Sequence, residues 1–400
     1  MRIGRVTLAS LKARPPVESF GSLWALVAKL GEAGDVAPDG SEVMRFINGY
    51  ADLLTSYEVG PLDVDGVTIA APDERMRPVQ VRIRRVRSPG SEGSRVGGLA
   101  VEGVEVAVSN GSVRLQSFEW RGADLAPTLA GLRAIDASAP LDWFVREWRR
   151  LVPSVRGVAL SGLEIDMADE ARPGERVKTG AGLVDVDFEE YRAGIPTQFM
   201  VAVRNLAFAL PRGGDDRTVE DLRQAGYERV DLSFGARSRW DEAARTIRLS
   251  DVTVEGAGMG GARLSLTLGN ATADLFSIDV MRQQAAALAL TAIEAQLSVQ
   301  NRGLFERLFQ SVAKRQGRKP EDMRREAARG IGLLALTMLG TEAGRPVTEA
   351  VTRFVGRPRT LEISAKAKDP AGVGALDLLM AGENPAGFAA KLDVQAKAGD

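Results

Sequence analysis

Three short segments of the chain share one pattern, and this pattern restricts the fold more than any other feature. "LDVDGVTI" (62–69), "LAVEGVEV" (99–106) and "VALSGLEI" (158–165) each read apolar-x-apolar-x-Gly-apolar-x-apolar. Side chains of a β-strand alternate between two faces, but in each copy the apolar positions change phase at the glycine. A strand that keeps one apolar face through such a change needs a β-bulge or a sharp bend.

Glycine adopts the backbone angles that such a site requires. We therefore expect Gly66, Gly103 and Gly162 to be structural bulge residues. Recurrent bulges twist and curl a sheet, and the unequal spacing of the copies excludes a regular solenoid. The sequence thus predicts an α+β, β-rich fold: a long curved antiparallel sheet, open like a trough or a taco, with inserted helices that cluster towards the C-terminus. Chance recurrence among Val- and Gly-rich strands is the alternative.

The expected elements divide the chain into two segments. Residues 1–153 read as a β-sheet segment with inserted helices, and residues 154–400 as a second one with a helical insertion at 303–356. No composition break marks a linker, so the two are expected to form one continuous elongated unit. The apolar run "IGLLALTML" (331–339) is shorter than the roughly 20 residues that span a bilayer, and it is expected to be a buried part of a helix.

The chain contains neither His nor Cys. This excludes Ser-His-Asp and Cys-His nucleophiles, and metal sites built from imidazole or thiolate ligands. The 52 basic and 53 acidic residues nearly cancel, so no net field favours nucleic acid. We expect no enzyme, no catalytic residues, no cofactor, no metal and no nucleic-acid partner. A hydrolase that uses only carboxylates, Lys and Ser is a distant alternative.

Two motifs of known enzymes occur in the wrong context. "GAGMGG" (256–261) contains G-x-G-x-x-G, but the next residues alternate as a strand, which favours a hairpin turn over a dinucleotide site. "SVAK" (311–314) and "KTG" (178–180) resemble the motif set of penicillin-binding proteins and serine β-lactamases. Their order is reversed, Ser311 falls inside an expected helix, and KTG falls in an expected charged loop.

Charged residues gather on the faces of two expected strands. In "LVDVDFEEY" (183–191), Asp185, Asp187 and Glu189 share one face. They could hold Ca²⁺ or Mg²⁺, although a solvated outer face is the favoured interpretation.

The main basic stretch is "RMRPVQVRIRRVR" (75–87), in which Arg82 and Arg84 share one face of an expected half-buried strand. Such an Arg row could contact anionic lipid head groups. A plain solvated face is the favoured alternative.

The layout of the whole chain resembles the AsmA-like and YdgA-like proteins of the Gram-negative envelope, particularly long uncharacterised alphaproteobacterial members. The segments that carry the resemblance are "LDVDGVTIAAPD", "LAVEGVEVAVSNGSVRLQSFEWRGAD", "YRAGIPTQF", "LSFGARSRWDEAARTIRLSDVTVEGAGMGGARLSLTLGN" and the closing "FVGRPRTLEISAKAKDPAGVGALDLLMAGENPAGFAAKLDVQAKA". The resemblance implies curved sheets with an apolar inner surface, a role in lipid movement or outer-membrane assembly, and a periplasmic location with one N-terminal helix in the inner membrane. It supplies no site residues.

This chain shows no such anchor. Membrane association is therefore expected through a segment absent from this chain, and a cytoplasmic location if Met1 is the true start.

Two functional hypotheses follow. The first is a non-enzymatic envelope protein that binds or transfers lipid, or another hydrophobic ligand, along an apolar sheet surface; plain core packing is the alternative role of the residues concerned. The predicted trough residues are the apolar members of the repeats: Val64, Val67, Val101, Val104, Leu160 and Leu163. The second is a structural or assembly scaffold whose helices, including 320–341, bind a protein partner of unknown identity and no lipid.

Overall fold

The computed structural model describes residues 1–32, 40–72, 77–136, 138, 140–169, 172, 174–211 and 217–399. The strands are β1 (Arg2–Leu8), β2 (Leu11–Ala13), β3 (Tyr57–Val59), β4 (Leu62–Pro72), β5 (Pro78–Ser88), β6 (Ser91–Glu92), β7 (Arg95–Val96), β8 (Leu99–Val108), β9 (Gly111–Trp120), β10 (Ala123–Asp124), β11 (Ser154–Val155), β12 (Gly157–Ala168), β13 (Arg176–Arg192), β14 (Ile195–Ala209), β15 (Arg229–Asp241), β16 (Thr246–Gly256), β17 (Gly260–Gly269), β18 (Thr291–Asn301), β19 (Thr360–Ala367), β20 (Val373–Gly374) and β21 (Leu392–Gly399).

The helices are α1 (Phe20–Glu32), α2 (Gly40–Leu54), α3 (Ala126–Arg133), α4 (Pro140–Glu147), α5 (Arg217–Gln224), α6 (Val280–Leu288), α7 (Leu304–Gln316), α8 (Pro320–Gly356), α9 (Ala375–Met380) and α10 (Pro385–Ala389). Short 3₁₀ turns lie at Trp148–Leu151 and Ala273–Phe276. Helices α7 and α8 occupy the region where the sequence predicts a helical insertion, 303–356.

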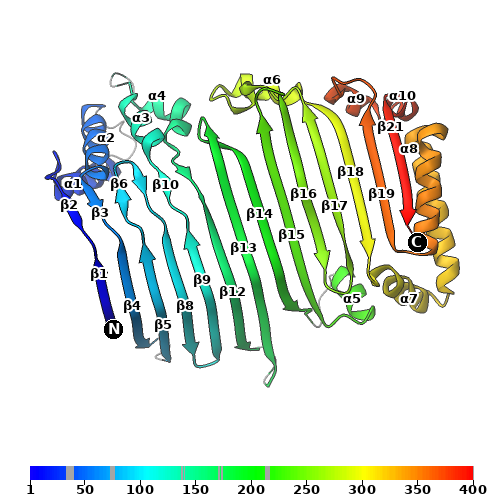
Figure 1. Cartoon of the computed structure of the whole chain (residues 1–400), viewed down its shortest axis with the longest axis horizontal. Coiled ribbons are helices and arrows are strands. Elements are labelled where there is room, and N and C mark those ends of the chain that lie inside the picture. The colour runs from blue at the N-terminus through cyan, green and yellow to red at the C-terminus, as the bar shows by residue number, and fades with distance from the viewer. Residues whose placement is uncertain are drawn as a thin grey trace. The chain divides into compact units, whose positions relative to one another are not determined.

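The main sheet is antiparallel and does not close on itself (Figure 1). Within the described part of the chain, its strands follow the order β1-β4-β5-β8-β9-β12-β13-β14-β15-β16-β17-β18-β19-β21, and β20 pairs with β18. Most neighbours in the sheet are therefore neighbours in sequence, as expected for strands joined by short turns. The predicted class, α+β and β-rich with a long open antiparallel sheet, is confirmed.

The chain forms two compact units. Unit 1 comprises Met1–Ala168, Asp185–Thr197 and Phe276–Val280, and unit 2 comprises Asp169–Val184, Gln198–Leu275 and Met281–Asp400. The sequence placed the boundary of its two segments after residue 153, whereas the structure keeps β12 in unit 1 and divides β13 between the units.

The repeated glycines have left-handed backbone in the middle of their strands. The φ angle is +68° at Gly66, +63° at Gly103 and +60° at Gly162. On β4 and β5, Asp65 pairs with Arg85 before the glycine and Val67 pairs with Ile83 after it, so the register is the same on both sides. The sequence left two possibilities, a β-bulge and a sharp bend. Because the register does not change, no residue is inserted at these sites, and each is a sharp local bend and not a bulge.

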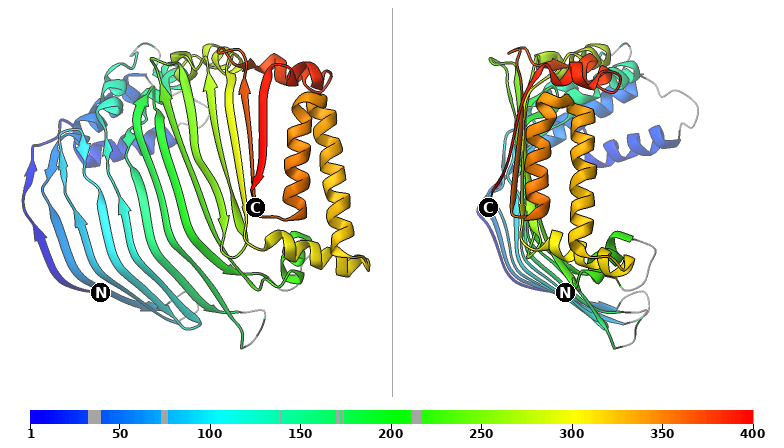
Figure 2. Two further views of the ribbon diagram at one scale, coloured as in Figure 1. Left: turned by 45° about the vertical axis from the view of Figure 1, so that its right-hand side comes forward. Right: turned by 90° about the vertical axis from the view of Figure 1, so that its right-hand side faces the viewer.

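The break crosses unit 1 as one row, which we call the glycine row. Its members, read across the sheet from β1 to β12, are Gly4, Gly66, Arg84, Gly103, Gln116 and Gly162. From β4 to β12, large side chains alternate with glycines, because each large side chain needs the space that the neighbouring glycine leaves open. A Cβ atom on Gly103 would lie 2.9 Å from Cβ of Arg84, and one on Gly162 would lie 2.7 Å from Cβ of Gln116. Strands of unit 1 bend along their length (Figure 2).

Replacing Gly103 with Ala tests the glycine row. The new Cβ has both an unfavourable φ and a contact of 2.9 Å with Arg84, so we expect the free energy of unfolding to fall by about 2–4 kcal/mol in urea titrations. Gly93→Ala is the matched control, because Gly93 has φ +58° and no atom within 4 Å of its added Cβ. It should lose only about 1 kcal/mol; equal losses would contradict the steric argument.

The helices of unit 1 form a core of their own. Val43 and Ile47 of α2 pack with Leu132 of α3, Ile135 and Trp143 of α4. Val43 and Ile47 are four residues apart and therefore lie on one face of α2.

An ion pair joins the residues before α1 to α2. Nε and Nη2 of Arg45 donate to the two carboxylate oxygens of Glu18 at 2.5 and 2.9 Å, and the Ser22 hydroxyl donates at 2.8 Å. The hydrogen bonds from Arg45 and Ser22 lower the pKa of Glu18 from 4.5 to about 2. The anionic form is therefore favoured in the folded protein.

This lowered pKa predicts a pH-dependent stability difference. Glu18 stabilises the fold above its unfolded pKa of 4.5, and this contribution disappears as the pH falls towards the folded value of about 2. We expect wild type to melt above Glu18→Gln at pH 6, and the gap to close between these two values. A gap that stays constant in calorimetry from pH 6 to pH 2 would contradict this linkage.

In unit 2, α8 is a helical hairpin that covers one end of the sheet (Figure 2). Gly340, with φ +69° and ψ −179°, separates its two arms, and the Thr348 hydroxyl of the second arm donates to the Gly332 carbonyl of the first at 3.1 Å. The second arm buries a set of side chains against β19 and β21. This set contains Val347, Ala350, Val351, Phe354, Val355 and Leu361, with Val299, Ile363, Val394, Ala396 and Ala398 packed around it.

The apolar run 331–339 lies in the first arm. The prediction that it is buried is wrong for three of its residues, since Ile331, Leu333 and Leu334 are 45%, 68% and 56% exposed. Ala335 of the same run is buried. The run is amphipathic in this structure: Ala335 joins the core cluster of the second arm and β19, while these three side chains face away from it.

Candidate functional site

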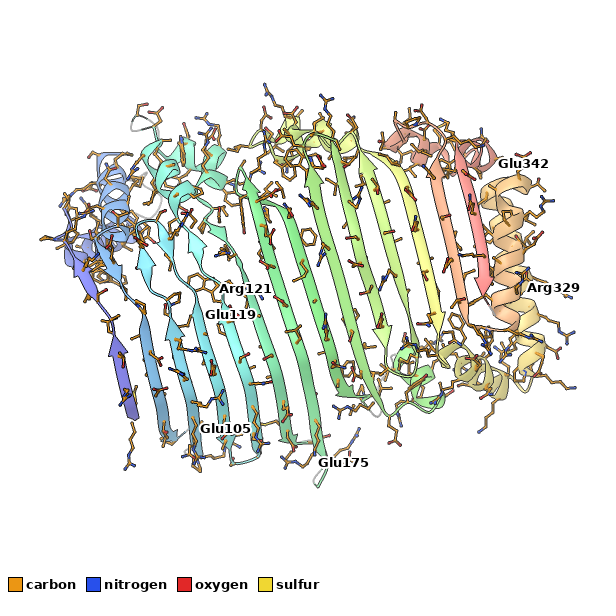
Figure 3. All side chains as sticks on the ribbon, viewed as in Figure 1. Glu105, Glu119, Arg121, Glu175, Arg329 and Glu342 are labelled. Atoms are coloured by element: carbon orange, nitrogen blue, oxygen red, sulfur yellow. The ribbon has the colours of Figure 1, made fainter. Side chains whose placement is uncertain are left out.

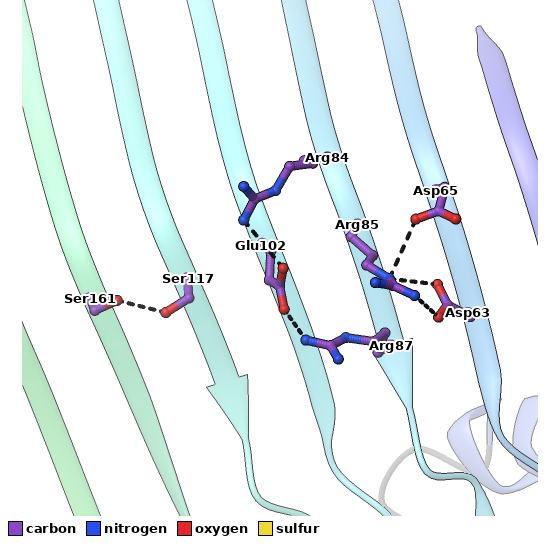
Figure 4. A network of polar contacts seen from close by, with 8 residues as sticks. All are labelled: Asp63, Asp65, Arg84, Arg85, Arg87, Glu102, Ser117 and Ser161. Carbon is purple, nitrogen blue, oxygen red and sulfur yellow. Dashed lines mark hydrogen bonds and ion pairs between the residues drawn. The ribbon is translucent and has the colours of Figure 1, made fainter.

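A network of polar side chains lies along the glycine row of unit 1, with Arg84 in the row and the other members beside it (Figure 4). The Glu102 carboxylate contacts Arg84 at 3.2 Å and also accepts a hydrogen bond from Arg87. In an unbroken strand, positions 84 and 87 would point to opposite faces. Their shared partner shows that the phase change keeps the charged residues together.

A third arginine, Arg85, extends this polar face. Nε of Arg85 donates to Asp63 at 2.9 Å and lies 3.4 Å from an Asp65 oxygen. The hydrogen bond from Arg85 holds the pKa of Asp63 below its usual value. Glu105 and Glu119 lie towards opposite ends of β8 and β9, on either side of the glycine row (Figure 3).

The apolar side chains therefore lie on the other face, which we call the apolar face. Two cross-strand rows border the glycine row there. Val64, Val86, Val101, Phe118 and Leu160 form the first, and Val67, Ile83, Val104, Leu115 and Leu163 form the second. All six predicted trough residues belong to these two rows, so the structure brings them together. Outer rows add Trp120 and Val158 on one side, and Ile69, Val81, Val106, Val113 and Ile165 on the other.

The sequence interpretation missed the contribution of β5 and β9, which carry no glycine at the break. Their signal is nevertheless present in the sequence. The apolar positions change phase between Ile83 and Val86 in β5, and between Leu115 and Phe118 in β9. Arg84 and Gln116 occupy the glycine row in these strands.

The apolar face belongs to a single layer. No side chain of the described strands β4, β5, β8 and β9 is buried. Ile69 and Val158 on the outer rows are 37% and 38% exposed, and Val6 on β1 is 57% exposed. Residues of a packed core are usually almost fully buried, so plain core packing does not describe these rows.

The two predicted head-group contacts, Arg82 and Arg84, lie on the polar face. Arg82 donates to Gln80 at 3.2 Å, and Arg84 pairs with Glu102. The sheet therefore separates these two arginines from the trough residues, and their contact with lipid head groups stays a prediction. Residues 75 and 76 of the basic stretch lie outside the described residues.

Two carboxylates of the acidic strand segment at 183–191 form ion pairs with an arginine side chain. The Arg121 guanidinium lies 2.8 Å from an Asp185 oxygen and 3.2 Å from an Asp187 oxygen, and all three side chains are at most about one-third exposed. Gly157 leaves the space for this contact, because a Cβ there would lie 3.3 Å from Nη1 of Arg121. The favoured interpretation as a solvated face does not hold for Asp185 and Asp187. Within the described part of the chain, no acidic cluster has a metal-binding arrangement.

Removing Arg121 leaves two adjacent carboxylates without their counter-charge. We expect Arg121→Met to lower the free energy of unfolding by about 1–3 kcal/mol, because the pair is partly shielded from water. Arg84→Met, which removes a 69% exposed arginine from the Glu102 pair, should cost under about 1 kcal/mol. Chemical denaturation of both variants checks the difference, and similar losses would show that Arg121 is no more than a surface charge.

The enzyme-like motifs occupy structural positions. "GAGMGG" forms the hairpin turn between β16 and β17, as the sequence predicts. Ser311 is buried inside α7. The prediction that KTG lies in a loop is wrong, because residues 178–180 lie in β13; residues 170, 171 and 173 of that expected loop are outside the described residues.

A family model described as "Uncharacterized protein" matches residues 253–399. No curated protein matches the chain, and no solved structure matches it. Among the helices of the described residues, none combines the length and the apolar character that crossing a membrane requires.

Proposed function

We propose that the protein binds lipid, or another hydrophobic ligand, on the apolar face of unit 1. The observation that supports this proposal is the pair of half-buried aliphatic rows beside the glycine row. With strands about 4.8 Å apart and residues about 3.3 Å apart along each strand, the face from β4 to β12 covers roughly 400 Å². This equals the largest apolar patch of a typical monomeric protein, and such patches are often functional.

The chemistry of the face suits acyl chains. Val, Ile and Leu side chains dominate its rows, and the charged residues of β4, β5 and β8 are occupied on the other face. An aliphatic chain that covers such a surface gains about 0.8 kcal/mol for each buried methylene. A lipid can therefore bind without a polar contact to the sheet.

The proposed setting is the Gram-negative cell envelope. It follows from the resemblance to AsmA-like and YdgA-like proteins, together with the apolar sheet surface that the resemblance leads one to expect. In this proposal the protein carries or shields a hydrophobic molecule and performs no chemical step. A periplasmic location and an inner-membrane anchor are part of the same proposal.

Neighbouring residues on β4 provide a matched test. Val67 lies on the apolar face, whereas Thr68 lies on the polar face opposite Arg82. We expect Val67→Glu to lower the amount of co-purified or added lipid by about tenfold, because a carboxylate on the apolar face must be desolvated by the ligand. Thr68→Glu should bind as wild type does. Native mass spectrometry, followed by organic extraction and lipid analysis, measures both.

Each result has a clear meaning, provided that both variants unfold at the wild-type temperature. A wild-type protein that remains free of lipid after incubation with phospholipid vesicles would overturn the proposal. Lipid that binds equally to Val67→Glu would place the ligand elsewhere. If the wild-type protein remains free of lipid, the better hypothesis is a scaffold that binds a protein partner.

A further inference from the structure

Two kinds of strand alternate across unit 1. Strands β4, β8 and β12 carry a glycine with positive φ at the glycine row, and we call them glycine strands. Strands β1, β5 and β9 have Gly4, Arg84 and Gln116 there, none of which has positive φ; we call them partner strands. Every pairing from β1 to β12 joins a strand of one kind to a strand of the other.

The position next to the glycine row obeys a charge rule. Across the sheet this row reads Arg5, Asp65, Arg85, Glu102, Ser117 and Ser161. Each Arg of a partner strand faces an acid on every glycine strand beside it, whereas Ser117 faces Glu102 on one side and Ser161 on the other. The two serine hydroxyls are 2.6 Å apart. Cross-strand pairs of this kind select the neighbour of a strand.

Strand β1 is a partner strand at the edge of the sheet. It pairs with β4 alone, and all seven of its residues are exposed. Ile3, Val6 and Leu8 extend the apolar rows to this edge, with exposures of 46%, 57% and 43%. Among the described residues, neither Arg2 nor Arg5 forms an ion pair, because Asp65 is directed to Arg85. The outer backbone groups of β1 pair with no described strand and can therefore accept a further strand, which must accommodate the charges of Arg2 and Arg5.

We propose that β1 binds an extended segment of a partner protein, which adds to the sheet as one more glycine strand. The alternation and the charge rule specify this segment: apolar-x-apolar-acid-Gly-apolar-x-apolar, with the acid opposite Arg5 and the glycine opposite Gly4. Backbone pairing supplies affinity, and the side-chain rows supply specificity. The proposal is independent of lipid binding.

A second copy of this chain does not fit the site. Its glycine strands β4, β8 and β12 already have a neighbour on each side, and its β1 is a partner strand. If two partner strands lay side by side, neither would have a residue with positive φ at the glycine row. Every pairing from β1 to β12 contains one such residue.

The chain provides the probe for a direct test. The peptide PLDVDGVTIA, residues 61–70, contains the glycine strand that already pairs with β1. We expect the labelled peptide to bind the full chain saturably in fluorescence anisotropy, and to slow amide exchange in residues 2–8. Peptides that carry Gly66→Val or Asp65→Arg should bind about tenfold more weakly.

A charge exchange completes the test. Arg5→Glu in the protein should weaken the native peptide about tenfold and restore binding of the Asp65→Arg peptide. Arg5→Gln, which places no acid opposite Asp65, checks that any loss is not a folding effect. No saturation up to about 1 mM, equal binding of all three peptides, or protection of a segment other than 2–8 would overturn the proposal. Self-association of the chain through β1 in light scattering would also overturn it.

Discussion

The structure of unit 1 depends on one backbone requirement: every strand must change its side-chain phase at the same place. A single strand with such a change would turn its apolar residues to the wrong face and lose its partners. The glycine row solves this by making the change common to all the strands, so that the register on either side is preserved. Positive φ is needed in every second strand only, and the intervening strands fill the vacant space with Arg84 and Gln116.

The shared phase change decides where charge and apolar surface lie. The ion pairs among Arg84, Arg87 and Glu102 join the glycine row to the residues beside it on one face. The opposite face keeps its aliphatic rows without interruption. At the end of the sheet in unit 2, the apolar side chains are covered by a helix. The second arm of α8 packs on the apolar side chains of β19 and β21. The proposed lipid site is thus the apolar surface of unit 1, whose strands contain no buried side chain in β4, β5, β8 or β9.

Much of this could be predicted from the pattern of apolar residues, because burial of one sheet face is a local property of each strand. The three glycines, the open antiparallel sheet and the six residues of the two central rows all followed from that pattern. The Arg121 contact with Asp185 and Asp187 could not be predicted, since it depends on which distant strands become neighbours. The exposure of Leu333 and Leu334 was missed for a related reason: an apolar run does not reveal that the helix turns back at Gly340 and that the core forms along one side of the first arm.

The alternation of two strand kinds also limits how a sheet like this one can change its length. Loss or gain of one strand inside the row from β1 to β12 would place two strands of the same kind side by side, and their phase changes and charges would no longer match. A hairpin of one glycine strand and one partner strand keeps the alternation intact wherever it is inserted. Inside the row from β1 to β12, the strand pair is therefore the unit whose insertion or removal leaves the alternation unchanged.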